Sequence, residues 1–339
     1  MASSIERPLV AVVGGDTLLA KELCELLSES KPAPRLQLIS AAVDGSILLA
    51  TEEENAVVMM PLSSESLEGA RVAFLAGSPA SSRRALKQNP PGGPVIIDLT
   101  AALEEQGNAR LRAPSAEPPP LSPGSSGDSS KSQIHVIAHP AAIALTMLLT
   151  RLAQFSPIRR SVIHVFEPAS ERGQRGLDEL QQQTVAVLAF KKLNTDVFDA
   201  QLGFNLLARY GEEALEGLGL VEERLERHLA SLLAAHPAIP MPSLRLIQAP
   251  VFHGHSFSIW VEFEENPGAE ELARSLAEAG IDVRPDDPPS NAGIAGVSGL
   301  SVGAIVRDPN QARACWLWMV SDNLRLTAEN AIAVAREVM

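Results

Sequence analysis

The chain has 339 residues, of which 45% are hydrophobic and 20% are charged, and its formal net charge is −13. This composition is typical of a globular protein and excludes the disordered and fibrous classes. The acidic balance argues against nucleic acid or an anionic membrane surface as a partner, because binding would begin against long-range repulsion.

The two cysteines, Cys24 and Cys315, exclude a disulfide framework and a cysteine-based metal cluster. No apolar stretch approaches the roughly 20 residues that span a bilayer. No export signal precedes the first strand, since the apolar run there is short and lacks a basic flank. We therefore expect a cytoplasmic protein, and the length favours about two domains.

The N-terminal half begins as a strand, a turn and a helix. Residues 9–13 are an apolar run that predicts a strand, and Gly14-Gly15-Asp16-Thr17 predicts the turn. Leucines at helical spacing predict an amphipathic helix over residues 18–28. Further strands are expected at residues 36–40, 57–60, 72–76, 95–97 and 135–138. Their helical or turn-rich spacers favour a parallel sheet, so we expect an α/β fold with a Rossmann-type domain.

The segment of residues 107–132 is rich in proline, serine and glycine. This composition predicts an exposed, flexible loop. In the second half, helices are expected from about 141 to 154 and at 177–188, 212–235 and 326–338. Strands are expected at 161–166, 244–248, 256–262 and 316–320, and residues 293–303 should form a flexible loop and a strand.

Several local strings in this order resemble one family. They are Val10-Ala11-Val12-Val13-Gly14, Gly173-x-x-Gly176-x-x-Glu179-Leu180, Phe204-Asn205, Pro250-Val251-Phe252-His253-Gly254-His255-Ser256 and Ser321-Asp322-Asn323-Leu324-Arg325. Over essentially the whole chain the sequence resembles the aspartate-semialdehyde dehydrogenase family. Active members reduce aspartyl phosphate with NADPH to the semialdehyde, a step in amino-acid biosynthesis.

The resemblance implies a two-domain architecture. A Rossmann-type domain of residues 1–138 would be completed by the C-terminal helix, residues 323–339. A central α/β domain of residues 139–322 would carry the catalytic site and form a homodimer.

The family's nucleophile is a cysteine in an Asn-Pro-Asn-Cys-Ser-Thr string at the start of a helix, where the helix dipole lowers the thiol pKa. The matching string here is His139-Pro140-Ala141-Ala142-Ile143-Ala144. The resemblance thus places Ala142 at the nucleophile position, and a methyl group cannot form a thioester. Neither Cys24 nor Cys315 falls at this element.

Other positions implied by the resemblance are partly retained. His255 occupies the acid/base position, although Phe257 replaces a glutamate two residues later. Gln248 stands where an arginine would hold the substrate carboxylate, and a neutral amide cannot replace a bidentate guanidinium. Glu104 stands at a phosphate-binding arginine position, and Glu167 at that of a glutamine that contacts the intermediate.

The cofactor loop has also changed. Gly14 and Gly15 keep the first turn, but Asp16 adds negative charge and Thr17 adds a side chain where backbone should approach the pyrophosphate. The turn is needed to connect strand and helix with or without a nucleotide. NADP binding is therefore open, with reduced affinity expected. Asn323 belongs to a string that either caps the last helix and ties the domains or contacts the cofactor.

Three functional hypotheses follow. The first is a non-catalytic homodimer resembling the Usg-type proteins grouped with this family. The second is different chemistry that uses His255 and a carboxylate such as Glu167. The third is ordinary semialdehyde dehydrogenase activity, which needs a nucleophile that the sequence does not provide.

Histidines also raise the question of a metal. His253 and His255 are two apart on the expected strand and would point to one face, with His139 near in space. Two histidines without a placed third ligand are more often incidental. We therefore expect no metal site.

Overall fold

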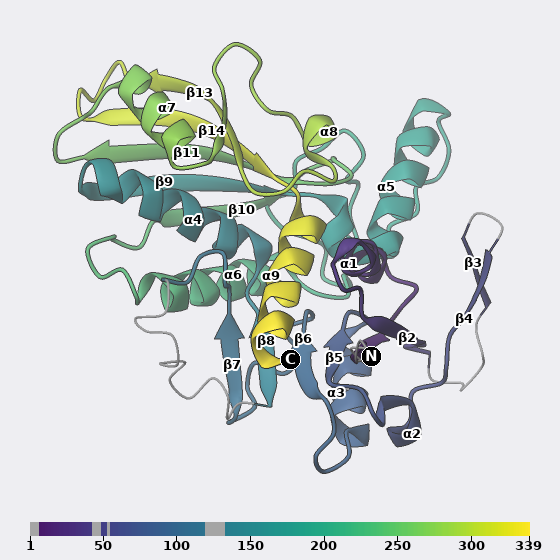
Figure 1. Cartoon of the computed structure of the whole chain (residues 1–339). Coiled ribbons are helices and arrows are strands. Elements are labelled where there is room, and N and C mark those ends of the chain that lie inside the picture. The colour runs from purple at the N-terminus through teal and green to yellow at the C-terminus, as the bar shows by residue number, and fades with distance from the viewer. Residues whose placement is uncertain (1–6, 43–48, 53–54, 119–132) are drawn as a thin grey trace. The chain divides into compact units, whose positions relative to one another are not determined.

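The computed structural model describes residues 7–42, 49–52, 55–118 and 133–339. The chain divides into two compact units (Figure 1). The N-terminal unit comprises Met1–Ala138 and Thr327–Met339, and the central unit comprises His139–Leu326. Among the helices of the described ranges, none is both long and apolar enough to cross a membrane.

The N-terminal unit is built on a six-stranded sheet with the order β2-β1-β5-β6-β8-β7. Its strands are β1 (Leu9–Val13), β2 (Arg35–Ile39), β5 (Val72–Leu75), β6 (Val95–Asp98), β7 (Ala109–Arg112) and β8 (Ile134–Ile137). Its other elements are the hairpin β3 (Leu49–Glu52) and β4 (Asn55–Val58), and the helices α1 (Leu18–Glu29), α2 (Ser64–Leu67) and α3 (Pro79–Gln88). Every pairing in the six-stranded sheet is parallel, which confirms the α/β prediction.

The order of these strands reverses beside β1. The chain runs from β1 outward to β2 and then returns to β5 on the other side of β1. In open parallel sheets such a switch point is where ligands bind, at the carboxyl ends of the strands. The turn of residues 14–17 lies at this edge, because it directly follows β1.

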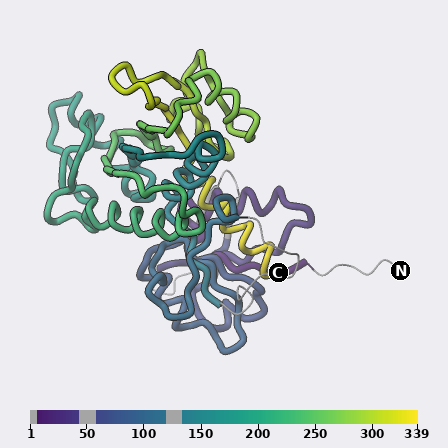
Figure 2. Tube along the Cα trace, turned by 90° about the vertical axis from the view of Figure 1, so that its left-hand side faces the viewer, coloured from purple at the N-terminus to yellow at the C-terminus, as the bar shows by residue number. Residues whose placement is uncertain are grey.

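The C-terminal helix α9 (Asn323–Val338) returns to the N-terminal unit, which includes Thr327–Met339. Its yellow ribbon ends beside strands of this unit in Figure 1, and Figure 2 shows the same return of the chain. The buried Arg112 contacts Glu337 at 2.7 Å. Asn330 accepts hydrogen bonds from the backbone N–H and the hydroxyl of Ser115.

The loop predicted for residues 107–132 is wrong in its first part. Residues 109–112 form β7, which pairs in parallel with β8. Arg112 at its end is buried and binds Glu117 at 2.9 Å, so polar contacts rather than an apolar run fix this edge strand. Residues 119–132 lie outside the described residues.

The central unit has a second six-stranded sheet, with the order β10-β9-β11-β14-β13-β12. Its strands are β9 (Ile158–Glu167), β10 (Ser243–Gln248), β11 (His255–Phe263), β12 (Asp282–Arg284), β13 (Ser301–Arg307) and β14 (Ala314–Ser321). Its helices are α4 (Pro140–Phe155), α5 (Gly173–Leu188), α6 (Leu218–Leu233), α7 (Ala269–Glu278) and α8 (Asn291–Ile294), with the 3-10 turn η1 (Ala169–Arg172).

Within the central sheet, β10 with β9 and β12 with β13 are parallel, and the remaining pairs are antiparallel. Helices α4, α6 and α7 contact one another or the same strands and cover one face of the sheet (Figure 1). The helix predicted over residues 212–235 is too long, because α6 starts at Leu218. Gly217 is its N-cap, and the preceding residues form turns. Helix α7 and strand β12 were not predicted.

Candidate functional site

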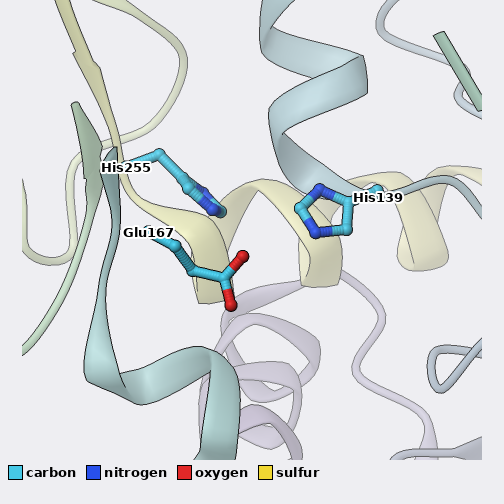
Figure 3. A group of neighbouring side chains, drawn as sticks. All are labelled: His139, Glu167 and His255. Carbon is cyan, nitrogen blue, oxygen red and sulfur yellow. The ribbon is translucent and has the colours of Figure 1, made fainter. Parts of the chain in front are cut away.

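A buried polar site lies in the central unit where one helix begins, one strand ends and another strand begins. The side chains of His139, Glu167 and His255 point toward one another there (Figure 3). We refer to these three residues as the imidazole–carboxylate cluster. Each residue has a local reason to stand at the end of its element.

His139 is the N-cap of α4. Its Nδ1 accepts a hydrogen bond from the backbone N–H of Ala141 at 3.2 Å, and Pro140 follows at the first helical position, which favours a helix start. The backbone N–H of His139 donates to Nδ1 of His228 at 2.9 Å. Since α4 is apolar and buried around its first turns, it holds the imidazole in a fixed place.

Glu167 is the last residue of β9, and Pro168 ends the strand. The carboxylate is fully buried, and its Oε1 accepts from Arg172 Nη2 at 2.8 Å. Arg172 also binds Glu216 at 2.8 Å and lies over the ring of Tyr210. Oε1 of Glu167 is thus paired with the Arg172 guanidinium, which also binds the Glu216 carboxylate.

His255 opens β11, which pairs with β9 so that Ser256 faces Phe166. The end of β9 and the start of β11 therefore lie side by side. Gly254 precedes His255 with φ +80°, and a Cβ there would come within 2.7 Å of the Ile294 side chain. Only glycine suits this turn without strain.

The cluster is compact and short of hydrogen bonds. One donor atom from each of the three residues lies within 4.8 Å of the others, and the two imidazole centroids are 5.6 Å apart. In the described part of the chain, no hydrogen-bond partner exists for Nε2 of His139, Oε2 of Glu167 or either ring nitrogen of His255. Buried polar atoms are nearly always paired, so four open ones at a single place require an explanation.

Burial shifts the protonation of all three groups. It lowers the pKa of His255 to about 3, although Asp322 acts in the opposite direction. Burial, reinforced by His255, holds the pKa of His139 well below its usual value. Burial also raises the pKa of Glu167 to about 7, against the influence of Arg172. At neutral pH both imidazoles are therefore neutral, the form that carries a free lone pair.

Two other predicted site residues lie beside the cluster. Ala142 is in the first turn of α4, and its methyl group is fully buried. Gln248 ends β10 next to Glu167. Its amide donates to the Glu167 carbonyl at 2.8 Å and accepts from the Tyr210 hydroxyl at 2.5 Å. Gln248 is thus fully engaged with its own chain.

The expectation that His253 and His255 share one strand face is wrong. Strand β11 begins at His255, and His253 belongs to the preceding turn. The amide of Asn291 binds the carbonyls of both His253 and Gly254 and holds this turn outside the strand. The third member of the group is Glu167, which the resemblance placed at the site but which was not predicted as a partner of the two histidines.

Arg172 and Tyr210 are also site residues that the sequence reasoning missed. Arg172 follows Glu167 closely, but an arginine among charged neighbours in a turn is a common surface pattern. Tyr210 is the chain's single tyrosine. It is buried, and burial raises its pKa above the ordinary value. The composition was the available signal, because a lone tyrosine in a polar segment is unusual.

Neither cysteine belongs to the helix that carries Ala142. Cys315 is near the start of β14 and pairs with Val261, whereas Ser321 at the opposite end of the strand pairs with His255. The Cys315 thiol faces the side-chain oxygen of Asn266 at 3.4 Å, and burial raises the pKa of this thiol. Cys24 belongs to α1 in the N-terminal unit.

The turn of residues 14–17 in the N-terminal unit does not have the form of a pyrophosphate cradle. Gly14 has φ +87°, and a Cβ there would lie 2.4 Å from Gly77 Cα. A Cβ on Gly15 would meet the side chains of Leu38 and Met59, at 3.1 and 3.4 Å. Both glycines therefore have a packing role against the chain itself, and Gly15 faces side chains where the second glycine of a nucleotide loop would leave space for the pyrophosphate.

Thr17 reinforces the same conclusion. It is the N-cap of α1, and its hydroxyl accepts from the Ala20 N–H at 3.2 Å and donates to the Ala76 carbonyl at 2.8 Å. Its side chain therefore occupies the start of the helix where a phosphate would bind. Asp16 beside it is exposed. The residues present do not fit the NADP pyrophosphate well. Glu104 belongs to a turn of the same unit.

Asn323 lies at the start of α9 within the central unit. Its side-chain oxygen accepts from the Gly254 N–H at 3.0 Å, and its amide nitrogen donates to Glu171 at 2.8 Å. Asp322 accepts from the N–H groups of Leu324 and Arg325 and so caps the helix. The string holds the turn before His255 in place, which accounts for Asn323 without a cofactor.

Comparison with known proteins gives consistent results. Residues 149–326 match the family model described as "Semialdehyde dehydrogenase, dimerisation domain". A "USG-1 protein homolog" of Pseudomonas aeruginosa is 31% identical over 332 residues, which cover 95% of this chain and 94% of the relative. An aspartate-semialdehyde dehydrogenase of Prochlorococcus marinus is 26% identical over 97% of this chain and 96% of its own. The solved structure of a probable aspartate-semialdehyde dehydrogenase from P. aeruginosa superposes with a TM-score of 0.83, at 26% identity and 98% coverage of each chain.

Proposed function

The chain belongs to the aspartate-semialdehyde dehydrogenase family, as a relative of the Usg type, and from this premise we propose that it is a homodimer that does not reduce aspartyl phosphate. The observation that carries the proposal is the buried methyl group of Ala142 at the start of α4. The acyl phosphate must be attacked by a thiolate, and an alanine offers none. Loss of a nucleophile that acts with partner groups typically lowers the rate by about a million-fold.

The surroundings of Ala142 support the same conclusion. A substrate carboxylate needs a bidentate cation, but Gln248 offers a neutral amide that Tyr210 and the Glu167 carbonyl already occupy. His139 stands in the string where the family has asparagine. Its imidazole faces His255, the residue at the acid/base position, with ring centroids 5.6 Å apart. The groups that would bind and activate the substrate are therefore changed together.

We also propose that NADP binds weakly. The glycines after β1 pack against Gly77, Leu38 and Met59, and the Thr17 hydroxyl occupies the start of α1. Calorimetric titration of the purified protein with NADPH measures this directly. We expect no binding at micromolar cofactor concentration, and a sub-micromolar Kd would contradict the proposal.

The turnover experiment uses aspartate semialdehyde, phosphate and NADP⁺ with the purified full-length protein. A mock preparation from the same host without the gene measures the contaminating host enzyme. We expect equal rates in the two preparations. Turnover above the mock preparation would refute the proposal. Persistence of such turnover in the Cys24→Ser/Cys315→Ser protein would further show that no thiol is needed.

The homodimer is supported by the distribution of exposed apolar side chains. Among the described residues, twelve of the fifteen exposed large hydrophobic residues lie in the central unit, outside the N-terminal sheet. Leu188 and Phe190 at the end of α5 are 69% and 98% exposed. Exposed large apolar side chains in such number are typical of a unit that has an interface.

Analytical ultracentrifugation tests this assignment. We expect a dimer for the native protein and at least a tenfold weaker dimer for Phe190→Glu. Val58→Glu is the matched control, because Val58 is also exposed but belongs to the N-terminal unit. A monomer at tens of micromolar, or equal effects of both substitutions, would contradict the proposal.

One observation favours a second candidate function, proton-transfer chemistry without a thiolate. Glu167 has a pKa raised to about 7 by burial and lies in one cluster with His255. Such a carboxylate is suited to general acid–base catalysis near neutral pH. An activity on a carbonyl substrate that Glu167→Gln abolishes would support this candidate. A screen whose every activity survives the substitution would exclude it.

A further inference from the structure

The imidazole–carboxylate cluster carries an inference beyond the proposed function. Three buried side chains from three different elements converge (Figure 3), and each has at least one nitrogen or oxygen atom without a hydrogen-bond partner in the described structure. In a metal-free protein this arrangement is costly, because each open buried polar atom has lost its contact with water and gained no partner. A shared occupant that accepts lone pairs would satisfy three open atoms at once.

We propose that His139, Glu167 and His255 bind a divalent transition-metal ion such as Zn²⁺. Two imidazole nitrogens and one carboxylate oxygen form a ligand set that favours zinc and its neighbours over Mg²⁺ or Ca²⁺, which prefer oxygen alone. Three protein ligands leave a further position for water, as in zinc sites that activate a ligand.

The distances suit a metal after a small contraction. Zinc bonds of about 2.0–2.2 Å place tetrahedral ligand atoms roughly 3.4 Å apart. The donor atoms here all lie within 4.8 Å of one another, so the widest pair must close by roughly 1.4 Å. Side-chain rotation of Glu167 supplies such a movement, since its Oε2 has no partner to give up in the described structure.

The local charge also favours a cation. Glu167, Glu171 and Glu216 supply three carboxylates, whereas Arg172 and Arg224 supply two guanidinium groups. The five groups interact directly or through shared partners, and Arg172 bridges Glu167 and Glu216. Arg172 binds Oε1 of Glu167 and leaves Oε2 to the cluster. The excess carboxylate requires either a proton or a cation.

The hydrogen bond from Ala141 to Nδ1 of His139 bears on the binding mode. A neutral imidazole that binds metal through Nε2 carries its proton on Nδ1, so the 3.2 Å contact from the Ala141 N–H would be lost. A single neutral hydrogen bond contributes much less free energy than a metal–ligand bond. Metal binding therefore replaces the Ala141–His139 hydrogen bond at the start of α4 with a bond from His139 Nε2 to the metal.

The experiment uses the full-length protein without a histidine tag, after treatment with a chelator and its removal. Calorimetry with Zn²⁺ should show one ion per chain, and Mg²⁺ at the same concentration should show none. Zinc-edge X-ray absorption should show nitrogen and oxygen ligands with two imidazoles. The titration extends to about 100 µM Zn²⁺, a concentration that detects even a weak specific site. Sulfur in the coordination sphere, or no binding of Zn²⁺ up to that concentration, would overturn the proposal.

Two conservative variants test the ligands without removing their structural roles. Glu167→Gln still accepts from Arg172, and His139→Asn still provides a good N-cap for α4. Each should lower zinc affinity by at least about a hundredfold, since loss of even an outer-shell partner typically costs about 10–100-fold.

His253→Asn is the matched control, because it removes a histidine two residues from His255 that lies outside the cluster. It should bind zinc as the native protein does. Zinc affinity retained in both ligand variants would overturn the proposal, and circular dichroism establishes that the variants are folded. Should either variant fail to fold, the X-ray absorption spectrum of the native protein decides alone. Turnover plays no part in these readouts, so the metal site and the proposed lack of reductase activity are tested separately.

Discussion

The β1–α1 turn, residues 14–17, and the imidazole–carboxylate cluster are the two places where the family resemblance puts function, and they differ in how their polar groups are used. In the turn, Thr17 binds Ala20 and Ala76, and the two glycines pack against neighbouring residues. In the cluster, four buried nitrogen and oxygen atoms have no partner within the described structure. The polar groups of the turn are satisfied by its own chain, whereas the buried open atoms of the cluster require another explanation.

The largest expected effect tests the packing role of the turn. Gly14→Ala places a Cβ 2.4 Å from Gly77 and forces alanine into φ +87°. Strain and overpacking together should lower the free energy of unfolding by about 3–5 kcal/mol. Gly69→Ala is the control, with φ +76° but nothing within 4 Å, and should cost about 1 kcal/mol. Urea unfolding measures both, and equal costs would show that the contact with Gly77 is unimportant.

The next effect concerns the open atoms of the cluster. Zinc at one hundred times its Kd should stabilise the native protein by about 2.7 kcal/mol, because only the folded chain presents the three ligands together. Glu167→Gln should remove this gain. Removal of zinc with a chelator should reverse it, as followed by the urea midpoint. Equal stabilisation of both proteins would place the ion elsewhere.

A smaller effect of opposite sign is expected from His255→Leu in metal-free protein. His255 is fully buried, and neither of its ring nitrogens has a partner among the described residues. Replacing it with an apolar side chain removes two unsatisfied atoms and should raise the free energy of unfolding by about 1 kcal/mol. The same substitution should abolish zinc binding. A loss of stability would mean that these nitrogens are paired in solution. The cluster would then not differ from the β1–α1 turn in having open polar atoms.

An effect of similar size to that of His255→Leu, but destabilising, is expected at Thr17. Thr17→Ala removes the N-cap of α1 and should cost about 1 kcal/mol, whereas Thr17→Ser keeps the hydroxyl and should cost less. Neither substitution should change NADPH binding measured by calorimetry. A weaker affinity in Thr17→Ala would indicate that the hydroxyl also serves a nucleotide.

Much of the fold follows from hydrophobic periodicity. The runs at β1, β5, β9 and β11 are apolar because these strands are largely buried, and their predicted positions agree with the structure to within a few residues. Strand β7 escaped prediction because its sequence Ala-Arg-Leu-Arg is polar and its stability comes from the ion pairs of Arg112. Helix α6 was predicted too long because the acidic residues before Gly217 fit helical spacing but form turns.

The candidate site was predictable only in part. The resemblance identified His255, Glu167 and Ala142 as site positions, and the sequence noted that His139 could approach His255. It could not show that Glu167 completes the group, because β9 and β11 are adjacent only through long-range pairing. Nor could it exclude His253, since a positive φ at Gly254 decides where the strand begins. Neither the long-range pairing of β9 with β11 nor the start of β11 after Gly254 can be predicted from hydrophobic periodicity.

Helix α9 has a consequence for synthesis of the chain on the ribosome. The central unit is one uninterrupted stretch, His139–Leu326, whereas the N-terminal unit needs Thr327–Met339, which are made only after the central unit. Until then the buried guanidinium of Arg112 lacks Glu337, and Ser115 lacks Asn330. Domains commonly mature in the order of translation. Here the order of completion is reversed, because the nascent N-terminal unit can bind its last helix only after the whole central unit has been made.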